Sequence, residues 1–171
     1  MNNRVILLAC ATLVCLSAAA ERILAAERWS GDGISWELPE GWKQREGNSP
    51  LRFAEINTGD DVVLVVSRFP GDVGGTLANV NRWRAQLNLK PIDEKELGKV
   101  TKAVQAGSTQ ALQVDLTSDS GEQRMLGLIL PDKKNQRTWF FKLTGPAKQL
   151  GERAEKFEQL VKSVRLAGDP K

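Results

Sequence analysis

The sequence predicts an α+β protein, a three-layer α/β/α sandwich around a mainly antiparallel sheet. The 171 residues are 41% hydrophobic and 26% charged, which suits one compact domain with its own core. Short apolar runs are separated by short polar turns, as in hairpins. Several of these runs are apolar at consecutive positions, so both faces of the strand need a cover. Two amphipathic helical segments are available to provide that cover.

Three strands are expected in the first half of the domain. Residues 34–38 alternate apolar and polar side chains, and residues 51–57 alternate again. In the second of these runs Leu51, Phe53 and Glu55 are expected on one side. Residues 62–69, VVLVVSRF, are apolar and β-branched at consecutive positions. We therefore expect this strand to be covered on both faces.

The second half begins with a loop and a short helical turn over residues 90–100. Three runs then follow with short polar separators and are expected to pair as hairpins, at residues 109–118, 124–131 and 137–145. The last segment, residues 146–164, has its apolar side chains at helical spacing and charged side chains on the other face. This segment predicts an amphipathic helix laid on the sheet.

Residues 1–26 have the layout of a secretory signal peptide, and the domain is expected to cover residues 27–171. Arg4 precedes an apolar run that is followed by small residues. The run is short for a membrane span, and no span is expected in the mature chain. Cleavage is expected after Ala26, with Ala20 as an alternative. In a second alternative, LLAC is a lipobox and Cys10 carries a lipid anchor. The sequence thus predicts an exported protein, periplasmic or secreted.

The composition argues against catalysis. The chain has no histidine and no tyrosine, and both cysteines, Cys10 and Cys15, lie in the predicted leader. The mature chain thus lacks the usual general base, the thiol nucleophile and the usual transition-metal ligands. The pair Asp60 and Asp61 offers too few oxygens for calcium. We expect no enzyme, no metal and no cofactor. Nucleic-acid binding is not expected either, because basic and acidic residues are interspersed.

The best candidate for a site is the stretch FPGDVGGTLANVNRWRAQL, residues 69–87. Gly74 and Gly75 permit a tight turn at the start of a helix, where backbone amides bind anions. Thr76 is expected to cap this helix. The stretch matches neither a phosphate-binding loop with its lysine nor a dinucleotide fingerprint.

The helix after this turn is expected to bury Trp83. Helical spacing places Leu77, Val80, Trp83 and Leu87 on one face, with Asn79 and Arg82 opposite. A polar row borders the apolar face and either pairs with the Gly-rich turn or lines a groove that receives a partner; of the two, we expect Arg84 to tie down the turn. This row consists of Asn81, Arg84 and Asn88. The candidate binding residues are Gly74, Gly75, Asn79, Asn81, Arg82, Arg84 and Asn88.

The order of elements is similar to that of a known superfamily. An aromatic strand and an LPEGW turn, residues 38–42, open the domain, and a WFFKLTGP strand leads into the closing helix. This pattern resembles the PsbP-like superfamily, which includes the extrinsic photosystem II subunit and DcrB-like bacterial lipoproteins. The resemblance covers most of residues 30–166 and implies an α/β/α sandwich. The metal-dependent role of the photosystem subunits, linked to histidine, is not transferred, because this chain has none.

Two functions are compatible with these features. The favoured one is an exported, non-catalytic binding or accessory module that meets a protein partner around residues 71–88. The alternative is a carrier of a small anionic ligand, or a weak hydrolase, with a pocket beside the Gly-rich loop.

Overall fold

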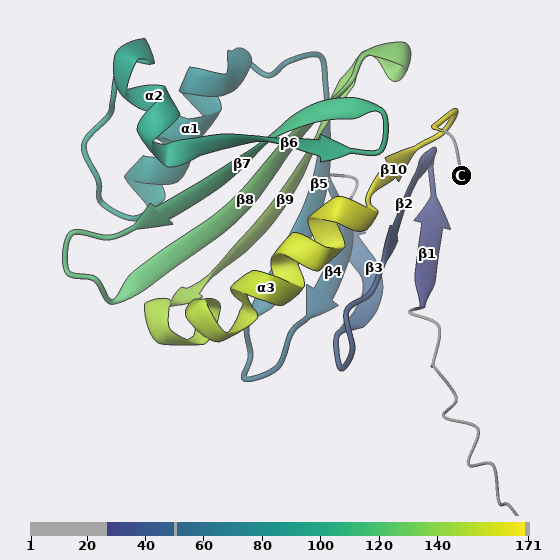
Figure 1. The fold of residues 1–171 in the computed structure, drawn as a ribbon, viewed down its shortest axis with the longest axis horizontal. Coiled ribbons are helices and arrows are strands. Elements are labelled where there is room, and N and C mark those ends of the chain that lie inside the picture. The colour runs from purple at the N-terminus through teal and green to yellow at the C-terminus, as the bar shows by residue number, and fades with distance from the viewer. Residues whose placement is uncertain (1–26, 50, 170–171) are drawn as a thin grey trace, which may run out of the picture.

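A seven-stranded antiparallel sheet forms the middle layer of the molecule (Figure 1). The structure is a computed structural model that describes residues 27–49 and 51–169, so the predicted leader and its cysteines lie outside it. The strand order is β3-β4-β5-β9-β8-β7-β6. The strands are β3 (Lys43–Ser49), β4 (Arg52–Asn57), β5 (Val63–Pro70), β6 (Thr101–Ala106), β7 (Thr109–Thr117), β8 (Gln123–Asp132) and β9 (Arg137–Pro146), and the 3₁₀ turn η1 (Lys133–Asn135) links β8 to β9.

Helix α3 (Ala147–Ser163) and a small second sheet cover one face of the large sheet (Figure 1). The small sheet has the order β1-β2-β10 and consists of β1 (Arg28–Gly31), β2 (Ile34–Glu37) and β10 (Arg165–Leu166). The core between these layers includes Trp36, Trp139 and Phe157, each fully buried. The predicted amphipathic helix is therefore confirmed. The small sheet was not expected, because the sequence predicted only the 34–38 strand of it.

Helices α1 (Gly75–Gln86) and α2 (Glu94–Val100) lie over the opposite face, above β7, β8 and β9 (Figure 1). Trp83 of α1 is buried in this second core with Phe140 of β9 and Met125 of β8. The β8 strand passes below the indole at Gly127, where an added Cβ would lie 2.2 Å from the ring. The three-layer arrangement and the core position of Trp83 are confirmed.

One predicted feature of the sheet is wrong: β5 is not covered on both faces. Its Leu64 and Val66 are fully buried beneath α3, whereas Val63 and Val65 on the other side are only half-buried. The reason is that α1 and α2 cover only the β7–β9 half of their face. Within the part of the chain that the structure describes, no helix lies over the same side of β3, β4 and most of β5.

The predicted facing of β4 is also wrong. Leu51 precedes the strand and is 53% exposed, and the pairing of β4 with β5 shifts register between Arg52 and Ala54. Phe53 consequently packs with Trp29 and Trp139, in the layer of α3 and the small sheet. Glu55 points to the opposite face, where it is 3% exposed and accepts hydrogen bonds from Arg45 and Arg52.

Candidate functional site

The Gly-rich turn, residues 71–75, has a mainly left-handed backbone and leads into α1. Gly71, Val73, Gly74 and Gly75 have φ of 66°, 54°, 85° and 82°. Successive residues in this region favour glycine, and Val73 is strained there. The start of the turn is fixed to the sheet, because the Thr138 hydroxyl donates to the Gly71 carbonyl at 2.7 Å.

The carbonyls of this turn are held from within the protein by Asn79 and Arg82. The Asn79 amide donates to the Gly75 carbonyl at 2.7 Å. Arg82 donates to the Asn79 side chain at 2.6 Å and to the Val73 carbonyl at 2.9 Å. Asn79 is therefore buried, which contradicts the prediction that it lies on the solvent side of α1. The cap prediction is also wrong, since Gly74 occupies the N-cap position in a left-handed conformation and no side chain caps the helix.

The predicted border row stabilises the segment after α1, and not the turn before it. Asn81 exchanges two hydrogen bonds of 2.9 Å with the backbone of Ile92. Arg84 donates to the Lys90 carbonyl at 2.8 Å, and exposed Asn88 has a φ of 57° in the turn between them. The expectation that Arg84 ties down the Gly-rich turn is thus wrong. Arg82 does so: it lies about two helical turns after Gly75, and its long side chain reaches back to the Val73 carbonyl.

A hollow of about 320 Å³ opens between α1 and the sheet, and we call it the α1 hollow. Its apolar wall is formed by Phe69, Trp83 and Phe140, which meet edge to face at centroid distances of 5.8 and 6.0 Å. Its polar rim is formed by Ser67, Asn79, Arg82, Gln86 and Lys142. Of the predicted site residues, the structure brings Asn79 and Arg82 to this hollow.

Gly75 lines a neighbouring hollow of about 290 Å³ on the other side of Asn79. Gly74, Asn81, Arg84 and Asn88 border neither of the two hollows. The predicted residues are therefore spread over the two ends and the two sides of α1, and they form no single cluster.

Lys142 of β9 is the residue of the α1 hollow that sequence reasoning missed. It is half-buried and donates to the Gln86 carbonyl oxygen Oε1 at 2.8 Å. Burial, together with repulsion from Arg52, lowers the pKa of its ammonium group. No carboxylate of residues 27–49 or 51–169 forms an ion pair with it. A polar position among consecutive apolar residues in WFFKL was the available signal.

Two cross-strand rows connect the core under α1 to the uncovered half of the sheet. One row runs Arg45, Glu55, Val65, Lys142, Gly127 and Val114. The other runs Arg52, Ser67, Phe140, Ile129 and Leu112. In both rows the end below α1 and α2 is apolar, and the end on β3 and β4 is cationic. The α1 hollow lies where the two rows change from cationic to apolar side chains.

The uncovered end of these rows is a positively charged surface, which we call the open face. Its cations are Lys43, Arg45, Arg52 and Lys142. Glu55 is the one carboxylate that the two rows place among them. Hydrogen bonds from Arg52 and Arg45 lower the pKa of Glu55 despite its burial. The side chains of the two arginines are still 50% and 75% exposed. The open face therefore has an excess of three positive charges that is accessible to a partner.

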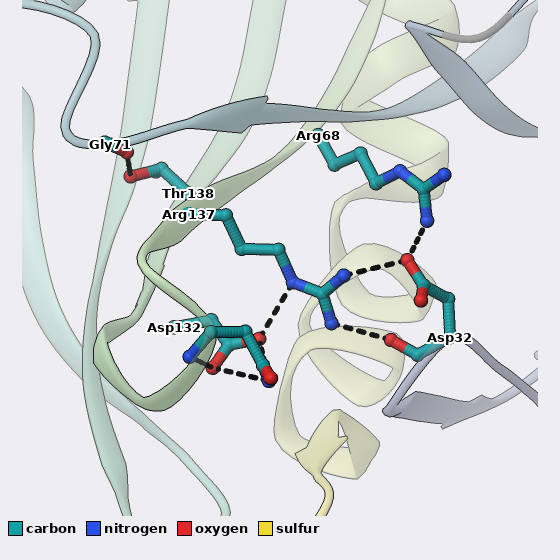
Figure 2. A network of polar contacts seen from close by, with 7 residues as sticks. Asp32, Arg68, Gly71, Asp132, Arg137 and Thr138 are labelled. Atoms are coloured by element: carbon teal, nitrogen blue, oxygen red, sulfur yellow. Dashed lines mark hydrogen bonds and ion pairs between the residues drawn. The ribbon is translucent and has the colours of Figure 1, made fainter.

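A second charged cluster, shown in Figure 2, links the small sheet to the large one. Arg137 donates to the Asp32 carboxylate at 2.7 Å and to that of Asp132 at 2.9 Å. Arg68 also pairs with Asp32. Burial would raise the pKa of Asp132, but hydrogen bonds from Asn135 and Arg137 lower it. Each charge in this cluster has a partner, so we assign it a structural role.

Another hollow, of about 640 Å³, lies between η1 and β10. Two carboxylates border it, those of Asp132 and Asp169. Both are already bonded within the protein, Asp132 to Arg137 and Asp169 to the backbone of Leu166. Asp60, in the turn between β4 and β5, likewise binds Arg153 of α3 at 2.7 Å. Neither place offers an unpaired charge in an apolar setting, as the α1 hollow does.

Comparisons with known proteins support the fold. No protein-family model matches the chain, and no curated protein sequence matches it. Among solved structures, the cyanobacterial PsbP protein CyanoP of Synechocystis matches with a TM-score of 0.55 and 16% identity, over 88% of this chain and 98% of that one. LpqN, a protein involved in cell envelope biogenesis of Mycobacterium tuberculosis, matches with a TM-score of 0.49 and 12% identity, over 84% and 86%. The chain has a PsbP-like fold, as the order of its elements predicted.

Proposed function

We propose that the protein is an exported, non-catalytic accessory module that binds an acidic surface of a partner protein. The observation that carries this proposal is the open face, a cationic half-sheet that no helix of the described residues covers. The contact surface predicted at residues 71–88 adjoins it through α1. In the described residues, no helix is long and apolar enough to cross a membrane.

The chemistry of the open face suits protein binding more than catalysis. Arg45 and Arg52 are fixed in place by Glu55, so little side-chain entropy is lost when a carboxylate of a partner approaches them. Val63 and Val65 provide half-buried apolar area between the cations. Such a surface steers an acidic partner electrostatically and then buries apolar area against it.

Two double variants test the proposal, and each makes the net charge of the protein more negative by three. Lys43 and Asn57 are cross-strand neighbours on the open face, and neither holds Glu55. The double variant Lys43→Glu, Asn57→Asp removes the positive excess, while the carboxylate introduced at position 57 can still accept from the Gly59 amide, as the Asn57 side chain does. The control is Lys102→Glu, Gln113→Glu, which changes a cross-strand pair on β6 and β7 at the other edge of the sheet.

The readout is capture of partners from an extract of the exported proteins of the source cell, identified by mass spectrometry. We expect the open-face variant to lose at least one acidic protein that the wild type and the control variant both retain. Capture should also weaken as salt increases, because the attraction is screened. Equal capture by all three proteins, each folded by circular dichroism, would overturn the proposal.

A further inference from the structure

We propose that the α1 hollow is a binding site for a small carboxylic acid with an apolar, preferably aromatic, body. This inference does not rest on the proposed function, because it concerns a small ligand and not a protein partner, and Lys142 is the one cation of the open face that it uses. The hollow lies beside the open face, and its wall is formed mainly by aromatic side chains. Its volume, about 320 Å³, is at the lower end of the range of about 300–1,000 Å³ that ligand pockets span.

The need for an anion comes from Lys142. Its ammonium group is half-buried and has one described polar partner, the neutral Gln86 side chain. A buried cation without a counter-ion is unfavourable, and its environment lowers its pKa accordingly. A carboxylate bound at Nζ of Lys142 would provide the negative counter-charge and would accept a hydrogen bond from one of the remaining N–H groups of the ammonium.

The need for an apolar body comes from the aromatic residues of the same hollow. Phe69, Trp83 and Phe140 line it, and Phe140 packs edge to face against each of the other two, as aromatic rings prefer. A ligand ring can join this cluster without disturbing it. An anion without an apolar body, such as acetate, would leave the wall in contact with water.

A phosphate compound suits the hollow less well than a carboxylate. The Gly-rich turn directs carbonyls, and not amides, toward Asn79 and Arg82. Both terminal nitrogens of Arg82 are already donating, to Asn79 and to Val73. Each of these nitrogens keeps a second N–H, so the rim of the hollow holds two cations, Arg82 and Lys142, of which Lys142 has no bond to a backbone carbonyl. Phosphate groups are usually bound through several backbone amides, whereas the contacts of this turn with Asn79 and Arg82 are made by its carbonyls.

The test is calorimetric titration of the purified protein with phenylacetate, phenylacetamide and acetate. We expect phenylacetate to bind at least tenfold more tightly than either the neutral amide or acetate. Lys142→Gln should weaken phenylacetate binding about tenfold to a hundredfold, since a charge-assisted hydrogen bond is lost. Lys142→Arg should restore most of the affinity. Lys102→Gln, at an exposed lysine on the far edge strand, should leave it unchanged.

Three results would overturn the site. These are no phenylacetate binding at millimolar concentration by the folded protein, equal affinity for the amide, or unchanged affinity in Lys142→Gln. The variant remains interpretable because removal of a desolvated cation should not lower the melting temperature. The outcome is separate from that of partner capture, because Lys43 and Asn57 do not line the hollow.

Discussion

Gly127 provides the sharpest test of how α1 is seated on the sheet. An added Cβ at this position would lie 2.2 Å from Cζ3 and 2.8 Å from Cη2 of Trp83. Carbon atoms in contact lie about 3.5–4.0 Å apart, so the indole must move by more than about 1 Å in Gly127→Ala. Overpacking of this kind costs about 1–3 kcal/mol. The reduced chain entropy of alanine offsets about 0.5–1 kcal/mol, so the middle of the two ranges gives a net loss of about 1.3 kcal/mol.

The assay is urea unfolding followed by circular dichroism, with Gly127→Ala, Trp83→Leu and the double variant. Trp83→Leu is destabilising by itself, because it leaves a cavity in the second core. The loss of unfolding free energy in the double variant should be smaller than the sum of the losses in the two single variants, by about 1 kcal/mol or more. The reason is that leucine at position 83 leaves room for the new methyl group at position 127. Full additivity of the two changes, or a stability of Gly127→Ala within about 0.3 kcal/mol of wild type, would refute this packing.

Three further predictions concern the turn and the two charged positions of the open face. Gly75→Ala should lower the free energy of unfolding by about 1–2 kcal/mol because φ of Gly75 is 82°, whereas Gly98→Ala in α2 should raise it by up to about 1 kcal/mol. An added Cβ would meet no atom within 4 Å at either position, so the two variants differ in backbone conformation and not in packing. Equal melting temperatures of the two variants would contradict this reasoning. The pKa of Glu55 is lowered on folding, so its stabilising effect is present above its unfolded value of 4.5 and is lost as the pH falls through the folded value. Glu55→Gln should flatten this acid limb in urea titrations, and an unchanged limb would show that other carboxyls cause it. The pKa of Lys142, which faces Arg52 and Arg82, is also lowered, so the folded state binds fewer protons. The unfolding free energy should therefore rise with pH from the lowered value to 10.5, and an identical slope in Lys142→Gln would argue against a desolvated ammonium group.

The layers were predictable because apolar side chains with a clear period determine them. The helix at 146–164 and the hairpins of β7, β8 and β9 follow directly from that period. The edge strands β3 and β6 were not predicted, since KQREGNS has no apolar side chain and TKAVQA has three, which are too few to show a clear period. The covering of β5 was mispredicted because a run of valines does not reveal how far a neighbouring helix extends.

The candidate site was predictable only in its location. The Gly-rich turn and the burial of Trp83 follow from glycine chemistry and helical spacing. The roles of Arg82 and Arg84 could not be assigned, because helical spacing indicates the face on which each lies, whereas their hydrogen bonds depend on the loops at either end of α1. Lys142 is distant in sequence from α1 and reaches the hollow only through the pairing of β5 with β9.

The central claim, that the open face is the contact surface, can be tested most directly by photo-crosslinking in the source cell. Benzoylphenylalanine replaces Val65 at the centre of the open face or, as the control, Lys102 on the far edge strand. We predict a discrete cross-linked product with an acidic protein from position 65 and none from position 102. Cross-linking from position 102 with none from position 65 would contradict the claim.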